Sequence, residues 1–275
     1  MRSSARAIEP GRATALGAAD GAALLTVERG LEVLRAFRSG RAPLSNSELV
    51  RRTGLPKATV SRLTSTLMQT GFLAQVPGHR EFELTTGALG IGHSFLSTSE
   101  LLQAAQPLLQ ALADRLDVSV ALGIGCGRDM LYVGYRVGRQ VATLRLGVGS
   151  VLPMASTAIG RAYLWGLPAA AQQRLVADLA RHCCKDPAAF EQGLRQSFAE
   201  LDARGTCAVL GGHQRGTYAV ALPVRLGRER VLMGLSCGKA DVDPRLEAER
   251  RRIAPALVEA ARELESGLRD IESPL

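Results

Sequence analysis

Apolar residues near the start of the chain recur at helical spacing in short, separate segments. The segment LLTVERGLEVLRAF, residues 24–37, places them three or four positions apart, which predicts one amphipathic helix. Its apolar positions are Leu24, Val27, Leu31, Leu34 and Phe37. Ser45 then precedes Glu48 by three residues, which is the spacing of a capping box, in which each side chain satisfies a backbone donor of the first turn. This spacing predicts a second helix, which ends at Gly54.

A third helix and a pair of strands follow. Pro56 suits the first position of a helix because its ring fixes φ and its missing N–H has no helical partner there, and Gly71 is predicted to end the helix. The apolar side of this helix consists of Val60, Leu63 and Leu67. The segment FLAQVPGHREFEL, residues 72–84, predicts two short strands around a Pro-Gly turn. Three helices and a hairpin in about 60 residues are typical of a winged helix-turn-helix.

The next stretch, residues 86–116, returns to a helical period. Its leucines recur at steps of three, four or seven residues, or sums of these, and predict a connecting helix that runs into a second domain. The leucines are Leu89, Leu96, Leu101, Leu108, Leu112 and Leu116.

The rest of the chain alternates strand and helix patterns. Strands are predicted at 118–125, 130–137, 141–146, 217–226 and 230–238, with hairpin turns at CGRD and at Gly227. Helices are predicted at 156–167, 169–183 and 245–271. Hairpin strands with helices between them favour an α+β domain built on an antiparallel sheet. The fold class expected for the whole chain is therefore α+β.

Charge divides the chain in the same place as the pattern. At 275 residues the chain is long enough for two domains. Residues 24–80 hold nine Lys or Arg and three acids, a net charge of +6, whereas residues 81–275 have a net charge of only +1. A basic small domain joined to a nearly neutral larger one indicates a polyanion partner for the first domain alone.

Five cysteines without a CxxC pair fit a reduced, cytoplasmic protein. No stretch is apolar for long enough to predict a transmembrane helix, and no membrane partner is expected. The Ala, Gly and Arg-rich segment 1–23 has no apolar core of a secretory signal and is interpreted as a disordered tail. The sequence predicts no metal site, cofactor or catalytic group.

The side of the third helix opposite its apolar face is small and polar. Leu55 has no side-chain acceptor, so the first-turn N–H groups stay open to a phosphate beside Lys57. Short side chains allow a duplex to approach closely, and Arg62 is long enough to reach a guanine edge. An isolated helix of this kind would be interpreted as merely solvated, but the capped helix before it and the hairpin after it favour DNA binding. The candidate DNA contacts are Lys57, Ala58, Thr59, Ser61, Arg62 and Ser65, with Arg80 in the wing.

A second candidate site lies in the segment LPMASTAIG, residues 152–160. Ser156 or Thr157 can cap the helix that follows Pro153, and a helix N-terminus with small hydroxyls suits a carboxylate. Apolar neighbours suit the remainder of a small organic acid. These neighbours are Leu144, Leu152 and Met154. The alternative is that the two hydroxyls only cap the helix.

These segments resemble the IclR family of bacterial transcriptional regulators. The resemblance spans roughly residues 24–270. It rests, in chain order, on LTVERGLEVLRAF, LSNSELVRRTGLPKATVSRLTSTLMQTGFL, FELTTGALGIGHSFL, GVGSVLPMASTAIGRAYLWGLP and YAVALPVRLGRERVLMGLSCG. It implies a winged helix-turn-helix domain (24–85), a linker helix (86–100) and a GAF-like effector-binding domain (101–275). It also implies assembly as a homodimer or a dimer of dimers.

The resemblance further implies a set of effector contacts. The matching positions are Leu144, Leu152, Ala158, Ile159, Thr217, Ala219 and Ser236, and Cys237 beside them is either a wall of the pocket or a core thiol. Val209 and Gly212 stand where family members often carry an acid, and Gly238 stands where a second serine is common. A pocket without that acid and flanked by His213 and Arg215 is expected to prefer a larger or more anionic ligand.

The function expected from the sequence is a DNA-binding regulator that is not an enzyme. Its partners would be a double-stranded DNA operator and a small-molecule effector, most simply a carboxylic acid. The alternative is a small-molecule-binding module or an enzyme whose basic N-terminal domain serves interactions with partners.

Overall fold

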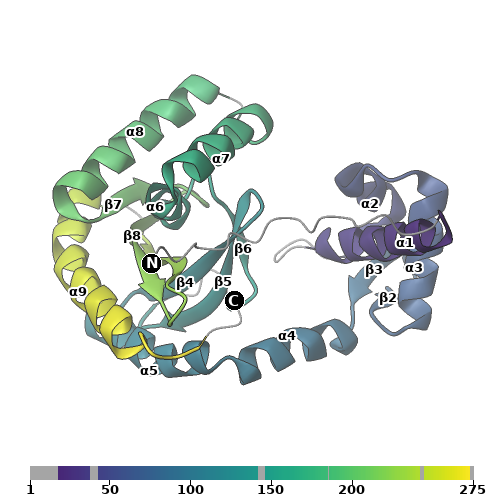
Figure 1. Cartoon of the computed structure of the whole chain (residues 1–275), viewed down its shortest axis with the longest axis horizontal. Coiled ribbons are helices and arrows are strands. Elements are labelled where there is room, and N and C mark those ends of the chain that lie inside the picture. The colour runs from purple at the N-terminus through teal and green to yellow at the C-terminus, as the bar shows by residue number, and fades with distance from the viewer. Residues whose placement is uncertain (1–17, 38–42, 142–145, 185, 242–244, 273–275) are drawn as a thin grey trace. The chain divides into compact units, whose positions relative to one another are not determined.

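The computed structural model describes residues 18–37, 43–141, 146–184, 186–241 and 245–272 of the chain, with backbone alone for 18–23. The chain divides into two compact units, residues 1–95 and 96–275 (Figure 1). Each unit has its own apolar core. The α+β class predicted from the sequence is confirmed.

The first unit is a winged helix-turn-helix. Its elements are α1 (Ala18–Arg35), β1 (Leu44–Ser45), α2 (Asn46–Thr53), α3 (Lys57–Gln69), β2 (Leu73–Gln75), β3 (Glu81–Leu84) and α4 (Thr86–Thr98), which extends past the end of the unit. The predicted hairpin is present as β2 and β3, and the short β1, which the sequence pattern did not predict, pairs with β3 on its other side. The sheet therefore has the order β1-β3-β2.

The predicted apolar face of α3 holds that helix in the core of the first unit. Val60 and Leu63 are buried and Leu67 packs against the same cluster, together with buried residues of α1 and α2. α3 ends as predicted, because Gly71 adopts a left-handed φ of 77° and the Phe72 N–H bonds back to the Leu67 carbonyl. The helix begins one residue later than predicted, with Pro56 as the N-cap.

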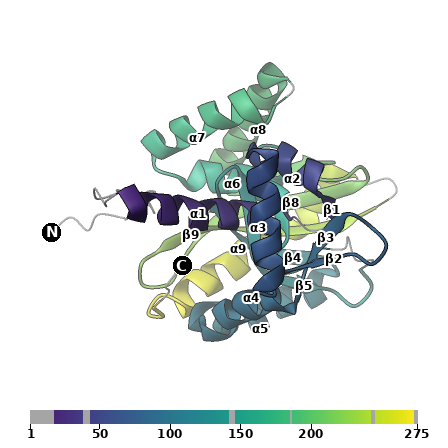
Figure 2. The same ribbon diagram turned by 90° about the vertical axis from the view of Figure 1, so that its right-hand side faces the viewer.

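α1 is the predicted amphipathic helix, and part of its apolar face is exposed. The helix is present, but Leu24, Val27 and Leu31 are exposed, whereas Val33 near its end and Ala36 directly after it are buried. Only the C-terminal part of the helix packs on α3, which α1 crosses in Figure 2. The apolar stripe of this amphipathic helix is therefore exposed from Leu24 to Leu31. The predicted boundary at residue 23 falls inside α1, and residues 1–17 of the predicted tail lie outside the described residues.

The single connecting helix predicted for residues 86–116 is wrong. Two helices occupy this stretch, α4 and α5 (Glu100–Leu116), and they are separated at Ser99. The Ser99 hydroxyl is fully buried and accepts a hydrogen bond from the Leu102 N–H at 3.4 Å, so it acts as an N-cap that starts a new helix. The leucine period continued across the break and concealed it.

The second unit is built on one antiparallel sheet. Its strands are β4 (Ser119–Cys126), β5 (Asp129–Val137), β6 (Val151–Pro153), β7 (Cys207–Leu210), β8 (Thr217–Leu226) and β9 (Val231–Ala240), in the order β6-β5-β4-β9-β8-β7. Its helices after α5 are α6 (Ala158–Gly166), α7 (Ala169–His182), α8 (Pro187–Arg204) and α9 (Leu246–Gly267). The two predicted hairpins are present as β4–β5 and β8–β9.

Helices cover the two faces of this sheet. α5 and α9 pack on one face and α6 packs on the other, with α7 and α8 against α6 (Figures 1 and 2). Two glycines show which helix packs against each face of the sheet. A Cβ built on Gly134 would lie 2.9 Å from Leu109 of α5, and a Cβ built on Gly234 would lie 2.5 Å from Ile159 of α6.

The sequence pattern predicted no element in the stretch 187–210 of the second unit, and one of its predictions cannot be compared. α8 and β7 fill the stretch 187–210, which the sequence pattern left without assigned structure. Asp186 caps α8 by accepting a hydrogen bond from the Ala189 N–H at 3.0 Å, and Pro187 starts the helix. The strand predicted at 141–146 lies mostly outside the described residues.

Candidate functional site

The polar face of α3 is open to solvent from its first turn. Pro56 at the N-cap provides no side-chain hydrogen bond, so the first-turn N–H groups have no cap, as the sequence predicted. Lys57 is exposed beside them. Of the other predicted DNA contacts on this helix, Thr59 is half-buried and the rest are exposed, namely Ala58, Ser61, Arg62 and Ser65. The structure thus brings all six onto the accessible surface of one helix.

The small hydroxyls on this face bond to the backbone of their own helix. The Ser65 hydroxyl donates to the Ser61 carbonyl at 3.0 Å, and the Thr66 hydroxyl donates to the Arg62 carbonyl at 3.1 Å. A hydroxyl that already donates its proton to a carbonyl can still accept a hydrogen bond from a donor on the edge of a DNA base. The surface of α3 therefore combines two cations with acceptor groups close to the backbone.

Arg80 lies at the tip of the wing. It is exposed in the turn between β2 and β3, where Gly78 adopts a φ of 76°. The Gln75 side chain donates to the His79 carbonyl at 2.9 Å and ties the two sides of the turn together. The wing thus presents a cation on a short, internally bonded hairpin.

The helix before α3 is held by a small charge cluster. The Ser45 hydroxyl accepts from the Glu48 N–H at 3.2 Å, as a capping box requires, but the Glu48 carboxylate bonds Arg51 and Arg52 instead of returning to Ser45. The capping box is therefore only half formed. Hydrogen bonds from Arg51 and then Arg52 lower the pKa of Glu48 from 4.5 to about 2. Arg52 also donates to the Ala36 carbonyl at 2.8 Å, which joins α2 to the end of α1.

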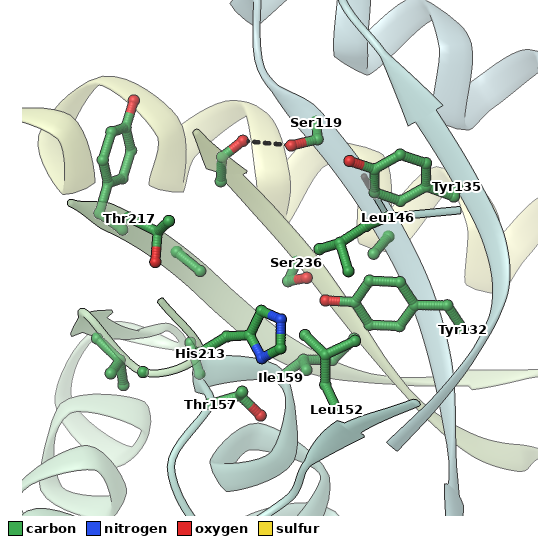
Figure 3. A pocket seen from close by; sticks show the side chains of 17 residues that line it. Ser119, Tyr132, Tyr135, Leu146, Leu152, Thr157, Ile159, His213, Thr217 and Ser236 are labelled. Carbon is green, nitrogen blue, oxygen red and sulfur yellow. Dashed lines mark hydrogen bonds between the residues drawn. The ribbon is translucent and has the colours of Figure 1, made fainter. Parts of the chain in front are cut away.

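The second unit contains a cavity between the sheet and the start of α6 (Figure 3). Strands β4, β5, β8 and β9 supply one wall, and Leu146, residues 152–159, Val209 of β7 and the loop after β7 supply the others. The lining residues are Ser119, Ala121, Tyr132, Tyr135, Leu146, Leu152, Thr157, Ala158, Ile159, Val209, Gly212, His213, Thr217, Tyr218, Ala219, Ser236 and Gly238. Their side chains are mainly apolar groups and neutral hydroxyls.

The N-terminus of α6 opens on this cavity. Thr157 is its N-cap, accepting from the Gly160 N–H at 3.3 Å and donating to the Pro153 carbonyl at 2.7 Å. The sequence allowed either Ser156 or Thr157 as the cap, and the structure selects Thr157. The N–H groups of Ala158 and Ile159 have no acceptor within the helix, and both residues line the cavity. A ligand oxygen can accept from them.

A β-bulge places two tyrosines on the cavity side of β5. Gly134 pairs with Leu122 and Tyr132 pairs with Gly123, so Val133 is the extra residue between two neighbouring pairs of the ladder. Without the bulge, side chains three positions apart would point to opposite faces of the strand. Instead the rings of Tyr132 and Tyr135 stack with centroids 6.0 Å apart and both line the cavity.

The loop after β7 closes the side of the cavity opposite these tyrosines. Gly211 donates to the Thr217 carbonyl at 2.6 Å, and the Thr217 hydroxyl donates to the Gln214 carbonyl at 2.6 Å. A Cβ on Gly212 would lie 2.3 Å from the Ser156 carbonyl oxygen, so the loop packs directly on the start of α6 at a position where only glycine fits. His213 from this loop faces the cavity (Figure 3).

The predicted effector residues divide into two groups. Seven of them line the cavity, namely Leu152, Thr157, Ala158, Ile159, Thr217, Ala219 and Ser236. Met154, Ser156 and Cys237 do not line it, and Leu144 lies outside the described residues. Met154 and Cys237 are fully buried in the core, and burial raises the pKa of the Cys237 thiol. Of the two alternatives for Cys237, the structure supports the core thiol.

Sequence reasoning missed the part of the cavity formed by β4 and β5. Ser119, Ala121, Tyr132 and Tyr135 all line it. The two tyrosines could not be placed together from the sequence, because the bulge at Val133 is visible only in the strand register. Ser119 gave a weak signal as the polar residue in an otherwise apolar strand segment, VSVALGIG.

A winged helix-turn-helix unit joined to a second unit that contains a cavity is typical of one class of DNA-binding regulators. Comparison with protein families identifies the particular family. The IclR helix-turn-helix domain matches residues 26–77, and the bacterial transcriptional regulator IclR C-terminal domain matches residues 93–266. The chain belongs to the IclR family of transcriptional regulators, and the relatives it matches are regulators, not enzymes.

Individual relatives agree with this assignment. The chain is 29% identical over 255 residues to the HTH-type transcriptional regulator TsaQ1/TsaQ2 of Comamonas testosteroni, covering 90% of each protein. It is similar to the crystal structure of an IclR family transcriptional regulator from Brucella abortus, with a TM-score of 0.79, 30% identity and coverage of 88% and 92%. It also shares its fold with an IclR homolog from Microbacterium hydrocarbonoxydans complexed with 4-hydroxybenzoate, with a TM-score of 0.61, 19% identity and coverage of 88% and 99%. Among the described residues, no helix is long and apolar enough to cross a membrane.

Proposed function

We propose that this regulator binds a small organic carboxylic acid in the cavity beside α6 and that the acid changes its affinity for operator DNA. The observation that carries the proposal is that Ala158 and Ile159, the first two residues of α6, line a largely apolar cavity. Helix N-termini favour anions because unpaired N–H groups and the helix dipole act together. The apolar walls formed by Leu152 and Ile159 accommodate the rest of the molecule.

β7 and the loop after it favour an anionic ligand. Val209 and Gly212 line the cavity at the positions where an acid was expected from the family pattern, so neither repels a carboxylate. His213 lines the same wall and can donate a hydrogen bond to the ligand. A homolog of the same fold holds 4-hydroxybenzoate, which makes that acid a reasonable member of a first screen.

We propose that α3 enters the major groove and reads it through Arg62, while Lys57 and the open first turn hold a phosphate. Arg80 in the wing would contact the backbone or the minor groove of the same duplex. The supporting observations are the exposure of these three side chains and the net charge of residues 24–80. The proposed location of this DNA-binding regulator is the bacterial cytoplasm.

We propose a homodimer, or a dimer of such dimers, as the DNA-binding form. Two helices of the first unit expose apolar side chains that a single copy leaves in water. These are Leu24, Val27 and Leu31 of α1, and Leu89, Ile91 and Phe95 of α4. A two-fold dimer would present two α3 helices to the half-sites of a pseudo-palindromic operator. Residues 24–85, 86–100 and 101–275 remain the proposed limits of the DNA-binding domain, linker and effector-binding domain.

A thermal-shift screen tests the effector class. The purified protein is heated with aliphatic and aromatic carboxylic acids, each paired with its uncharged carboxamide. An acid that raises the melting temperature, while its carboxamide does so much less, supports a carboxylate at the α6 N-terminus. Ser236→Ala should reduce that rise because Ser236 lines the cavity. Melting shifts that are equal for acids and carboxamides, or unchanged in Ser236→Ala, would contradict the proposed site.

A further inference from the structure

Strand β8 connects the cavity to the opposite face of the sheet. Thr217 lines the cavity, as Figure 3 shows, and Ala219 lines it too. Side chains alternate along a strand, so the Tyr218 side chain between them points to the other face, on which α5 and α9 pack. A Cβ built on Gly238, another lining residue, would lie 2.6 Å from the Tyr218 carbonyl oxygen, so the backbone of Tyr218 belongs to the cavity wall. A ligand that moves this part of β8 therefore also moves the Tyr218 side chain.

The Tyr218 hydroxyl is held by a carboxylate of α9. It donates to Glu249 Oε2 at 2.6 Å, and Arg252, one turn later in α9, donates to the same oxygen through Nε at 3.2 Å and Nη2 at 2.7 Å. Burial by itself would raise the pKa of Glu249, but the hydrogen bonds from Arg252 and Tyr218 outweigh it and lower that pKa, so the carboxylate is charged at neutral pH. Tyr218, Glu249 and Arg252 are called the Glu249 cluster below.

The Glu249 cluster ends on α5. Nη1 of Arg252 donates to the Leu116 carbonyl at 2.7 Å. Leu116 is the last residue of α5, and the last carbonyls of a helix have no partner within it. A cation in this position is favourable because it also meets the negative end of the helix dipole. Hydrogen bonds therefore lead without a gap from a strand of the cavity wall to the C-terminal end of α5.

α5 is the helix of the second unit that directly follows the linker in the chain. α4 begins in the first unit and ends at Thr98, and the buried Ser99 then caps α5. One capping residue therefore separates the two helices. A change in the position or the stability of α5 can reach the DNA-binding unit along the chain through α4.

We propose that Tyr218, Glu249 and Arg252 are positioning residues that transmit the state of the cavity to α5. An acid that contacts β8 at Thr217 or Ala219 displaces Tyr218, and the Glu249 cluster passes this displacement to the last turn of α5. The operator affinity changes as a result. This coupling rests on the proposed function and adds to it the residues through which the acid acts on the DNA-binding unit.

A second contact between the sheet and α5 limits how much of the coupling one substitution removes. Lys239 is the partner of Tyr218 in the β8–β9 ladder, and its ammonium group donates to the Asp117 carboxylate at 3.2 Å. Asp117 is the C-cap of α5 and adopts a left-handed φ of 48°. Disruption of the Glu249 cluster leaves this contact in place, so the coupling should be weakened and not abolished.

The coupling factor tests the role of the cluster. It is the ratio of the operator dissociation constants of the full-length protein with and without a saturating acid. The duplex comes from the region upstream of the protein's own gene. The acid is whichever of benzoate, 4-hydroxybenzoate, phenylacetate and hexanoate raises the melting temperature most, and fluorescence anisotropy measures the binding.

Glu249→Gln should bring the coupling factor closer to one by about threefold or more, because a neutral amide holds its two donors less firmly than a carboxylate does. Its operator affinity without acid, and its affinity for the acid in calorimetry, should stay within about twofold of the parent values. Glu249 lies outside the cavity lining and outside the first unit, so neither binding event loses a contact. A merely structural ion pair would leave the coupling factor unchanged.

Glu259→Gln provides the matched control. Glu259 also joins α9 to α5, through an ion pair with Arg115 at 2.7 Å, but both side chains are largely exposed and no described hydrogen bond leads from this pair to the sheet. This variant should keep the coupling factor of the parent. Tyr218→Phe should lower the factor as Glu249→Gln does, and the double variant should fall no further, because both substitutions break the same chain of contacts. Equal losses in Glu249→Gln and Glu259→Gln, or additive losses in the double variant, would contradict the proposal.

Hydrogen exchange supplies a second readout that needs no DNA. The acid should change the exchange of backbone amides at 112–118 in the parent and in Glu259→Gln, and should change it less in Glu249→Gln. If an acid binds and alters operator affinity, but Glu249→Gln keeps the parent's coupling factor and exchange, the Glu249 cluster is not the link, although the proposed function remains. If none of the four acids binds and the wider thermal-shift screen finds no carboxylic acid, the acid site itself is refuted, and this coupling with it.

Discussion

Two cations on α3 have different surroundings and should have different effects on DNA binding. Arg62 is exposed in the middle of the helix, where it can reach a base edge, whereas Lys57 lies in the uncapped first turn. We expect Arg62→Ala to cost about 1 to 3 kcal/mol on the preferred operator and to relax sequence preference. We expect Lys57→Ala to weaken binding to all sequences and to lower the dependence on salt. Fluorescence anisotropy with operator and random duplexes at several salt concentrations measures both effects.

Arg195→Ala is a suitable control for these two variants. Arg195 is also exposed, with a side-chain exposure of 72%, but it lies on α8 in the second unit. Removal of its charge should leave the operator affinity close to that of the parent protein. If Arg62→Ala and Lys57→Ala behaved like Arg195→Ala on both duplexes, α3 would not be the DNA-binding helix.

Glu48 should titrate far below an ordinary glutamate. The hydrogen bonds from Arg51 and Arg52 lower its pKa from 4.5 to about 2, so the ion pair stabilises the fold fully above about pH 4.5. That stabilisation is lost as the pH falls from about 4.5 towards 2, because the unfolded state takes up the proton first. An NMR titration of the Glu48 carboxyl carbon should give a midpoint near 2. A midpoint near 4.5 would show that the two arginines do not bind this carboxylate in solution.

At the scale of the element, α6 depends on one hydroxyl for its cap. Thr157 accepts from the Gly160 N–H, whereas the adjacent Ser156 does not cap the helix. Thr157→Ala should lower the free energy of unfolding by about 1 kcal/mol. Ser156→Ala, the matched control, should change it by less than about 0.5 kcal/mol. Urea denaturation measures both values, and equal losses would mean that the two hydroxyls share the cap.

Elements with a local signal were predictable from the sequence, and those set by tertiary contacts were not. Gly71 ends α3 and Gly227 turns the β8–β9 hairpin, because each needs only a positive φ. Ser99 breaks the predicted long helix by capping in a buried position, which the leucine period could not reveal. The bulge at Val133 depends on strand register, so the sequence could not bring Tyr132 and Tyr135 together.

The candidate sites followed the same division. Residues of α3 could be named from one helical period, because exposure on a single helix is a local property. For the cavity, the helix cap and the apolar neighbours in the sequence indicated the segment 152–159. Nothing in the sequence indicated that β4 and β5 form another wall of the same cavity. The helical period of α1 showed that one face is apolar but not what covers it, and Leu24, Val27 and Leu31 on that face are exposed.

At the scale of the whole molecule, the exposed apolar faces of α1 and α4 predict self-association. Val27 and Ile91 are each 64% exposed, and a charge at either position should weaken a homodimer. We expect Val27→Glu and Ile91→Glu to shift the protein towards the monomer in sedimentation velocity runs. Leu210→Glu, at a residue 52% exposed in the second unit, should not. A parent protein that sediments as a monomer at every concentration would contradict the proposed assembly.

The central claim, that a carboxylic acid bound beside α6 alters operator binding, is tested most directly by one titration. The protein is titrated into a labelled duplex from the region upstream of its own gene, with and without the acid that stabilises it best, and into a random duplex of equal length. We expect preferential binding of the upstream duplex, a change in that affinity when the acid is present, and no such change in Ser236→Ala. Equal binding of both duplexes, or an operator affinity that the acid leaves unchanged, would contradict the account.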